Sequence, residues 1–160
     1  METLTLKSSH TLKNRYLAQK LNFLLNILQE SKHGYDNIAS QLPDKSVQRA
    51  IESISTECAQ YISELNAQVS SLGGEPDVYA PTSSTEMFKW SHTQSWGTSN
   101  NEDILTACST RENLIIKAYR EVLNDPSLYK PLRSMITYQL NGMLYAFVRV
   151  KLLNTTLRHS

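Results

Sequence analysis

The sequence predicts an all-α fold, a four-helix bundle made of two similar helical hairpins, and three observations support this. Apolar residues recur at spacings of three and four along four segments of the 160-residue chain, the period of a helix that buries one face. The pattern of the first half returns about 80 residues later, so that Leu24 corresponds to Ile104. Proline-containing breaks at residues 42–44 and 124–126 interrupt the two halves at matching places.

The first hairpin consists of helices predicted over about residues 12–41 and 44–72. Residues 1–10 alternate as in a strand, and we expect them to form a loose arm or a short cap. Asp44 suits the start of the second helix, because its carboxylate can accept hydrogen bonds from free backbone N–H groups. Gly73 and Gly74 tolerate the left-handed backbone of a helix end. The stripe that the first helix buries is predicted to be Leu17, Leu21, Leu24, Leu28, Tyr35, Ile38 and Leu42.

The second hairpin consists of helices predicted over about residues 101–123 and 127–155. The intervening segment, about 73–100, is longer than the roughly two to eight residues that join neighbouring antiparallel helices. It can follow a helix of roughly 42 Å and still form a short helix around residues 86–90. We therefore expect a crossover along the bundle, with the second and third helices parallel. The whole chain, 1–160, is expected to be one domain.

Composition excludes several classes of partner. Sixteen Lys and Arg residues balance fifteen Asp and Glu residues, for a formal net charge of +1, so neither a nucleic acid nor an anionic membrane is an expected partner. The apolar runs are too short to span a bilayer, and the N-terminus lacks the pattern of a secretion signal. Two cysteines do not make a disulfide framework. A reducing, cytoplasmic location is therefore expected.

Four segments resemble one known family. They are Gly34-Tyr35, Glu57–Leu65 (ECAQYISEL), Leu72–Pro76 (LGGEP) and Lys117–Leu123 (KAYREVL). The chain is similar over about residues 20–153 to a bacterial family of uncharacterised ferritin-like proteins, which have a Leu-Gly-Gly-Glu-Pro turn after the second helix. The resemblance implies a ferritin-like fold, and it implies no activity.

A bundle of this architecture often holds two metal ions, and the sequence is mostly wrong for that site. A di-iron carboxylate centre needs a Glu on each of two helices and a Glu-x-x-His pair on each of the other two. Helical phase places the following residues there: Ser31 or Lys32, Cys58 with Tyr61, Arg111 or Glu112, and Gln139 with Gly142. Only Glu112 is a good hard-metal ligand, with Glu57 and Cys58 as the other candidates. No Glu-x-x-His occurs, so neither a metal nor another cofactor is expected.

The predicted mid-bundle polar cluster is Ser31, Lys32, Tyr61, Glu112 and Gln139. Lys32 and Glu112 occupy equivalent positions of the two halves, which suggests an ion pair in place of a metal-bridged carboxylate pair. The alternative is that both side chains reach solvent at the flank of the bundle.

Tyrosine hydroxyl groups are expected to join this cluster. A hydrogen-bond network with Gln139 and Ser31 is the expected arrangement of the tyrosines on the core stripes. These tyrosines are Tyr35, Tyr61, Tyr119 and Tyr145.

Three further features suggest a possible role. Cys58 and Cys108 both lie on core stripes, either as small apolar residues or as a redox pair. Phe88 and Trp90 of the linker either seal the groove between helices or form an exposed patch for a partner or second subunit. Phe23 belongs to a second apolar strip on the first helix, with Tyr16 and Ile27, which indicates dimerisation or cover by the linker.

Three functions follow from these observations. The first is a metal-free ferritin-like bundle that acts as a binding or structural module, as a homo-oligomer such as a dimer or with another protein partner. The second is a degenerate metal-binding protein or oxidase that uses Glu112 and Glu57. The third is a thiol redox sensor. No nucleophile–base–acid set, phosphate loop or paired Cys-x-x-Cys motif occurs, so an enzyme is the less favoured reading.

Overall fold

The computed structural model describes residues 2–74 and 101–158, with side chains described for residues 12–74 and 103–153. The helices of this part are α1 (Glu2–Gln41), α2 (Lys45–Ser71), α4 (Asn101–Leu123) and α5 (Lys130–Arg158). No strand occurs among the described residues, so the predicted all-α class is confirmed for them. Within the same ranges, no helix combines the length and the apolar character that crossing a bilayer requires.

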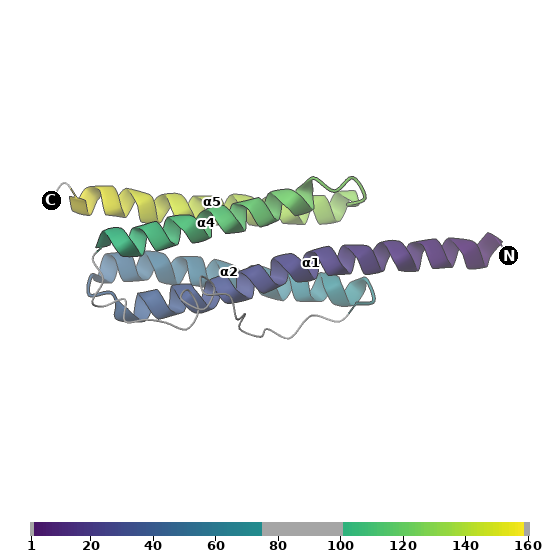
Figure 1. The fold of residues 1–160 in the computed structure, drawn as a ribbon, viewed down its shortest axis with the longest axis horizontal. Coiled ribbons are helices and arrows are strands. Elements are labelled where there is room, and N and C mark those ends of the chain that lie inside the picture. Colours follow the sequence, from purple (N-terminus) through teal and green to yellow (C-terminus); the bar gives the residue numbers. More distant parts are fainter. Residues whose placement is uncertain (1, 75–100, 159–160) are drawn as a thin grey trace.

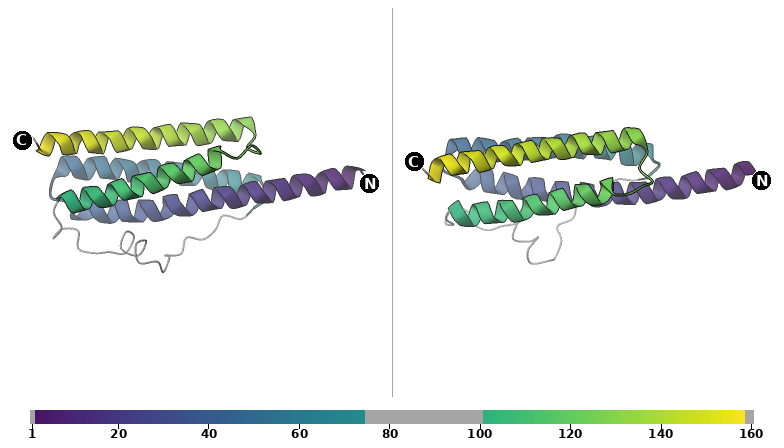
Figure 2. Two further views of the ribbon diagram at one scale, coloured as in Figure 1. Left: turned by 45° about the horizontal axis from the view of Figure 1, so that its top comes forward. Right: turned by 90° about the horizontal axis from the view of Figure 1, so that it is seen from above.

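The described helices lie side by side as a bundle (Figures 1 and 2). Helix α1 packs against α2 and α4, and α5 packs against the same two helices. Figure 1 shows that α1 and α5 run in one direction and that α2 and α4 run in the other. Each helix is therefore antiparallel to both of its main neighbours. Helices α2 and α4 are parallel and diagonally placed, as the length of the connection between them predicts.

Helix α1 begins much earlier than the sequence pattern indicates. Residues 2–10, predicted as a loose arm or cap, are helical and continue directly into the rest of α1. No glycine or proline precedes Gly34, and extending an existing helix costs little compared with starting one. Figure 1 shows the N-terminal part of α1 extending beyond the ends of the other helices.

Helix α2 begins and ends at the predicted residues for the predicted reasons. The Asp44 carboxylate accepts hydrogen bonds from the backbone N–H groups of Ser46 and Val47, at 2.9 and 3.0 Å. At the other end, Gly73 has a φ of 81°, a left-handed conformation in which a side chain would be strained. The N–H groups of Gly73 and Gly74 donate to the carbonyl groups of Ser70 and Val69, both at 3.0 Å. This is the Schellman arrangement, which satisfies carbonyl groups that the helix leaves unpaired.

The predicted buried stripe of α1 is confirmed in full, from Leu17 to Leu42. One expectation about a neighbouring face is wrong, because Tyr145, predicted to lie in the interior, is 71% exposed. In the second apolar strip of α1, Ile27 is buried, whereas Tyr16 and Phe23 are 47% and 50% exposed. The largest side chains of the interior are Tyr35, Tyr61, Tyr119 and Phe147.

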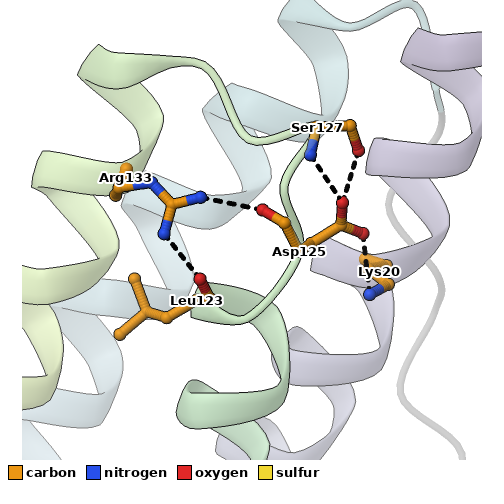
Figure 3. A network of polar contacts seen from close by, with 5 residues as sticks. All are labelled: Lys20, Leu123, Asp125, Ser127 and Arg133. Atoms are coloured by element: carbon orange, nitrogen blue, oxygen red, sulfur yellow. Dashed lines mark hydrogen bonds and ion pairs between the residues drawn. The ribbon is translucent and has the colours of Figure 1, made fainter.

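A buried aspartate in the turn between α4 and α5 ties that turn to α1 (Figure 3). The Lys20 ammonium group of α1 lies 2.7 Å from the Asp125 carboxylate, whose side chain is 4% exposed. Ser127 donates to the same carboxylate from its backbone N–H, at 2.8 Å, and from its hydroxyl group. Arg133 donates to the carbonyl groups of Leu123 and Asp125, at 2.5 and 2.8 Å. The turn occupies residues 124–129, so α5 begins at Lys130, and not near residue 127 as predicted.

Replacing this aspartate is expected to destabilise the bundle in a pH-dependent way. The hydrogen bonds from Lys20 and Ser127 hold the pKa of the Asp125 carboxyl below its ordinary value. Such a group adds stability above its unfolded pKa of about 3.9, and the contribution disappears as the pH falls from there through the folded pKa. Asp125→Asn should lower the free energy of unfolding by about 1–3 kcal/mol at pH 7. Denaturant titrations should show that the difference from wild type shrinks below about pH 4.

Asp44→Asn is the matched control, because Asp44 is exposed and asparagine caps a helix about as well as aspartate. It should leave the stability at pH 7 nearly unchanged. A difference between wild type and Asp125→Asn that is the same at pH 3 and pH 7 would contradict the role of the ion pair.

Candidate functional site

Two clusters of polar groups lie between the helices. One lies between α2, α4 and α5 and consists of Glu57, Tyr61, Glu64, Tyr119, Gln139 and Gly142; we call it the tyrosine cluster. The other lies between α1, α4 and α5 and consists of Glu30, Arg111, Glu112 and Lys151; we call it the charged cluster.

A hydrogen-bonded chain runs through the tyrosine cluster from the core to the surface. The Tyr119 hydroxyl donates to Oε1 of Gln139 at 3.0 Å. Nε2 of Gln139 then donates to Oε1 of Glu64, also at 3.0 Å. Tyr119 and Gln139 are both 0% exposed, whereas Glu64 is half-buried. Both polar groups of the buried amide are therefore used inside the protein.

Tyr61 lies directly against the backbone of α5 at Gly142. A Cβ atom added to Gly142 would lie 1.9 Å from the Tyr61 hydroxyl oxygen and 3.2 Å from Oε2 of Glu57. Burial raises the pKa of Tyr61 well above its ordinary value, and the hydrogen bond to the Glu57 carboxylate raises it further. Tyr61 is therefore a neutral donor to Glu57, in a space that exists because residue 142 has no side chain.

The charged cluster contains an ion pair that the sequence pattern did not reveal. Oε1 of Glu30 on α1 lies 3.8 Å from an Nη atom of Arg111 on α4, and both side chains are buried. Oε2 of Glu112 lies 3.4 Å from Nζ of Lys151 on α5. Burial raises the pKa of Glu112, while the nearby Lys151 lowers it in part. Each buried carboxylate thus has a cation from a different helix.

The predicted ion pair between Lys32 and Glu112 is wrong. Nζ of Lys32 instead lies 2.7 Å from Oδ2 of Asp36, one turn further along α1 and at the surface. Glu30 lies two residues before Lys32, a rotation of about 200° around the helix, and it is Glu30 that faces α4. The other predicted member of the cluster on α1, Ser31, is fully buried and donates to the carbonyl group of Ile27 at 2.6 Å.

The residues that sequence reasoning missed are Glu30, Glu64 and Lys151. The helical phase of the sequence indicates Arg111 only as an occupant of a ligand position. A weak signal for Glu64 exists in the sequence, because it follows Tyr61 by three residues and so shares its helix face. No such local signal identifies Lys151, whose partner lies on a different helix.

The donor set does not fit a di-metal centre. Glu57 lies beside Gly142 at the contact between α2 and α5, whereas Glu112 on α4 is paired with Lys151. Over the residues whose side chains are described, no group of three or more His, Cys, Asp and Glu residues is placed to hold a metal ion. The histidine in that part of the chain, His33, is exposed.

The two thiols are buried and unreactive. Cys58 and Cys108 are 0% and 2% exposed, and they are free. Burial raises the pKa of each thiol to about 12. Burial also raises the pKa of Tyr35, and the two thiols contribute to that shift. Because the thiolate is the reactive form, neither cysteine is activated for redox chemistry.

Of the three predicted interface residues, only Phe23 lies among the described residues. It is 50% exposed and lines a surface groove of about 300 Å³ between α1 and α4. The other residues that line it are Tyr16, Gln19, Lys20, Glu121 and Val122. Phe88 and Trp90 lie outside the described residues.

Comparison with known proteins identifies a family without assigning an activity. Residues 17–125 match the model of a family described as a domain of unknown function (DUF2383). The match begins in α1, includes α2 and α4, and ends at Asp125, so that α5 lies beyond it. None of the curated proteins compared with the chain matches it.

Gly142→Ala is expected to destabilise the protein, because the new methyl group would overlap the Tyr61 hydroxyl oxygen. The expected loss is about 1–3 kcal/mol in the free energy of unfolding, although alanine favours an isolated helix by about 1 kcal/mol over glycine. Denaturant titration measures the change. The neighbouring exposed position provides a matched control, since Asn141→Ala should have little effect. Combining Gly142→Ala with Tyr61→Phe, which removes the overlapping oxygen, should recover part of the loss. Additive effects of the two substitutions would contradict this account.

Cys58 and Cys108 are expected to resist thiol reagents until the protein unfolds. A pKa near 12, against an ordinary value of 9.0, lowers the thiolate fraction at pH 8 by about a thousandfold. A chromogenic disulfide reagent should therefore react slowly in buffer and fully in denaturant, and Cys58→Ser and Cys108→Ser should each remove one equivalent. Fast reaction of either thiol in the folded protein would contradict the prediction.

Proposed function

The chain belongs to the DUF2383 family, and from this premise and the arrangement of its interior we propose that it is a ferritin-like bundle that binds no metal. Its proposed role is that of a binding or structural module. Both parts of the proposal draw on the directions of the helices and on the contacts of the two polar clusters.

The ferritin-like assignment is supported by the directions of the helices. In bundles of this type, two antiparallel hairpins are joined by one long crossover, which leaves the second and third bundle helices parallel. Helices α2 and α4 run in the same direction here (Figure 1), and the segment between them covers residues 72–100. A bundle with short connections would instead make α2 and α4 antiparallel.

The contact between Tyr61 and Gly142 is the main observation that supports a bundle without a metal site. Helical phase assigns these two positions to the ligand pairs of a di-metal bundle, one on α2 and one on α5. A phenol and a glycine occupy them, and the phenol packs so closely that residue 142 has no room for even a methyl group. A ligand side chain on α5 could not enter this space without displacing Tyr61.

The remaining polar groups are already engaged with one another. Gln139 uses its amide on Tyr119 and Glu64, and Lys151 neutralises Glu112. A divalent cation would have to break these contacts, and the buried hydrogen-bond donors would then lose their acceptors, which is costly. The degenerate metal-binding alternative, which uses Glu112 and Glu57, is therefore less well supported. The redox alternative is weakened by the raised thiol pKa values.

Metal analysis tests the metal-free proposal. The untagged protein is incubated with ferrous iron, manganese or zinc, dialysed and analysed by plasma mass spectrometry. Metal content far below one ion per chain is expected, with the same content in Glu112→Ala. Stoichiometric metal that disappears in Glu112→Ala would overturn the proposal in favour of a metal-binding protein.

A further inference from the structure

Helix α5 carries an apolar stripe on its outer face. The stripe consists of Tyr138, Tyr145, Val148 and Leu152, which are 65, 71, 50 and 63% exposed. The intervals of seven, three and four residues between them are those of the a and d positions of a coiled coil. We call these four residues the α5 stripe.

We propose that the α5 stripe binds the same stripe of a second copy of this chain, with the two α5 helices antiparallel. The two-fold axis would pass by Tyr145, which would then face its own counterpart. Tyr138 of each copy would lie opposite Leu152 of the other. The interface is thus self-complementary, as a two-fold dimer requires.

The charges beside the stripe fit this partner. Arg149 is exposed and follows Gly142 by seven residues, so it lies on the same side of α5. Glu57 of α2 lies on that side too, because its Oε2 is 3.2 Å from the position of a Cβ atom on Gly142. The antiparallel two-fold arrangement brings the α2 sides of the two copies together, with Arg149 of one copy near Gly142 of the other. Arg149 of each copy therefore approaches Glu57 of its counterpart, which makes two favourable charge pairs.

The exposed area of the stripe suits the core of a modest dimer interface. Tyr138 and Tyr145, about two-thirds exposed, present on the order of 250 Å² together if a buried tyrosine covers about 200 Å². Val148 and Leu152 add on the order of 100 Å², taking about 100 Å² for a fully buried aliphatic side chain. A patch of about 350 Å² is of the size that is often functional on monomers. A standard interface buries about 800 Å² per partner, so polar residues around the stripe would supply the rest.

This interface uses the outer face of α5, whereas the metal-free proposal rests on the interior. Metal analysis therefore tests only the metal-free proposal, and the solution mass tests only the dimer.

The solution mass of the full chain tests the interface. Sedimentation equilibrium should give twice the chain mass of 18.2 kDa. Tyr145→Glu should raise the dissociation constant by at least about 30-fold, the effect of losing a central interface residue, because two carboxylates would then meet at the axis. Phe23→Glu is the matched control on the groove between α1 and α4, and it should remain dimeric. A monomeric wild type, or a dimer that Phe23→Glu dissociates and Tyr145→Glu does not, would overturn the proposal.

Disulfide trapping tests the orientation. Tyr145→Cys should cross-link to its own counterpart under mild oxidation, because the axis places the two positions together. Tyr138→Cys should cross-link with Leu152→Cys in a mixture of the two variants, and not with itself. Tyr129→Cys, at another exposed tyrosine, is the control that should stay uncross-linked. The buried native thiols leave the background low. Self-linking of Tyr138→Cys, or no link at Tyr145→Cys, would overturn the antiparallel arrangement.

Discussion

The close approach of α5 to α2 at Gly142 is the contact on which the rest of the interior depends. Because residue 142 has no side chain, the Tyr61 hydroxyl lies against the backbone of α5 and donates to Glu57. The same approach brings Gln139, one turn earlier on α5, within reach of Glu64 on α2. A bulkier residue at position 142 would separate the two helices and leave the Gln139 amide buried without its partner, which is costly.

Helix α5 contributes a residue to each of the two polar clusters although it lies beyond the family match. It contributes Gln139 to the tyrosine cluster and Lys151 to the charged cluster. The match ends at Asp125, the residue that anchors the α4–α5 turn to α1 through Lys20 (Figure 3). The matched segment therefore holds buried polar groups whose partners it does not itself contain. Tyr119, which donates to Gln139, and Glu112, which is paired with Lys151, are two of them.

The buried ion pair of the charged cluster contributes to pairing specificity more than to stability. Removing two charges from water costs several kcal/mol per ion, and mutual attraction repays this only in good geometry. The separation of 3.8 Å between Glu30 and Arg111 is longer than that of a strong charge-assisted hydrogen bond. An α4 packed against α1 in another register would bury both charges without partners. The cost of such an alternative, and not the strength of the pair, favours the observed register of α1 and α4.

The sequence by itself determined the helical class, the ends of α2 and the residues of the buried stripe of α1. These features are local, since a period of 3.6 residues selects the buried face and a capping carboxylate or a left-handed glycine acts within one turn. Asp44, Gly73 and Cys58 could therefore be assigned correctly. Only the tertiary structure decided which charges meet and which aromatic side chains remain outside, because each additional residue turns a side chain by about 100°. The rotation and the close packing of the neighbouring helices therefore decide that Lys32 pairs within α1 and that Tyr145 faces solvent.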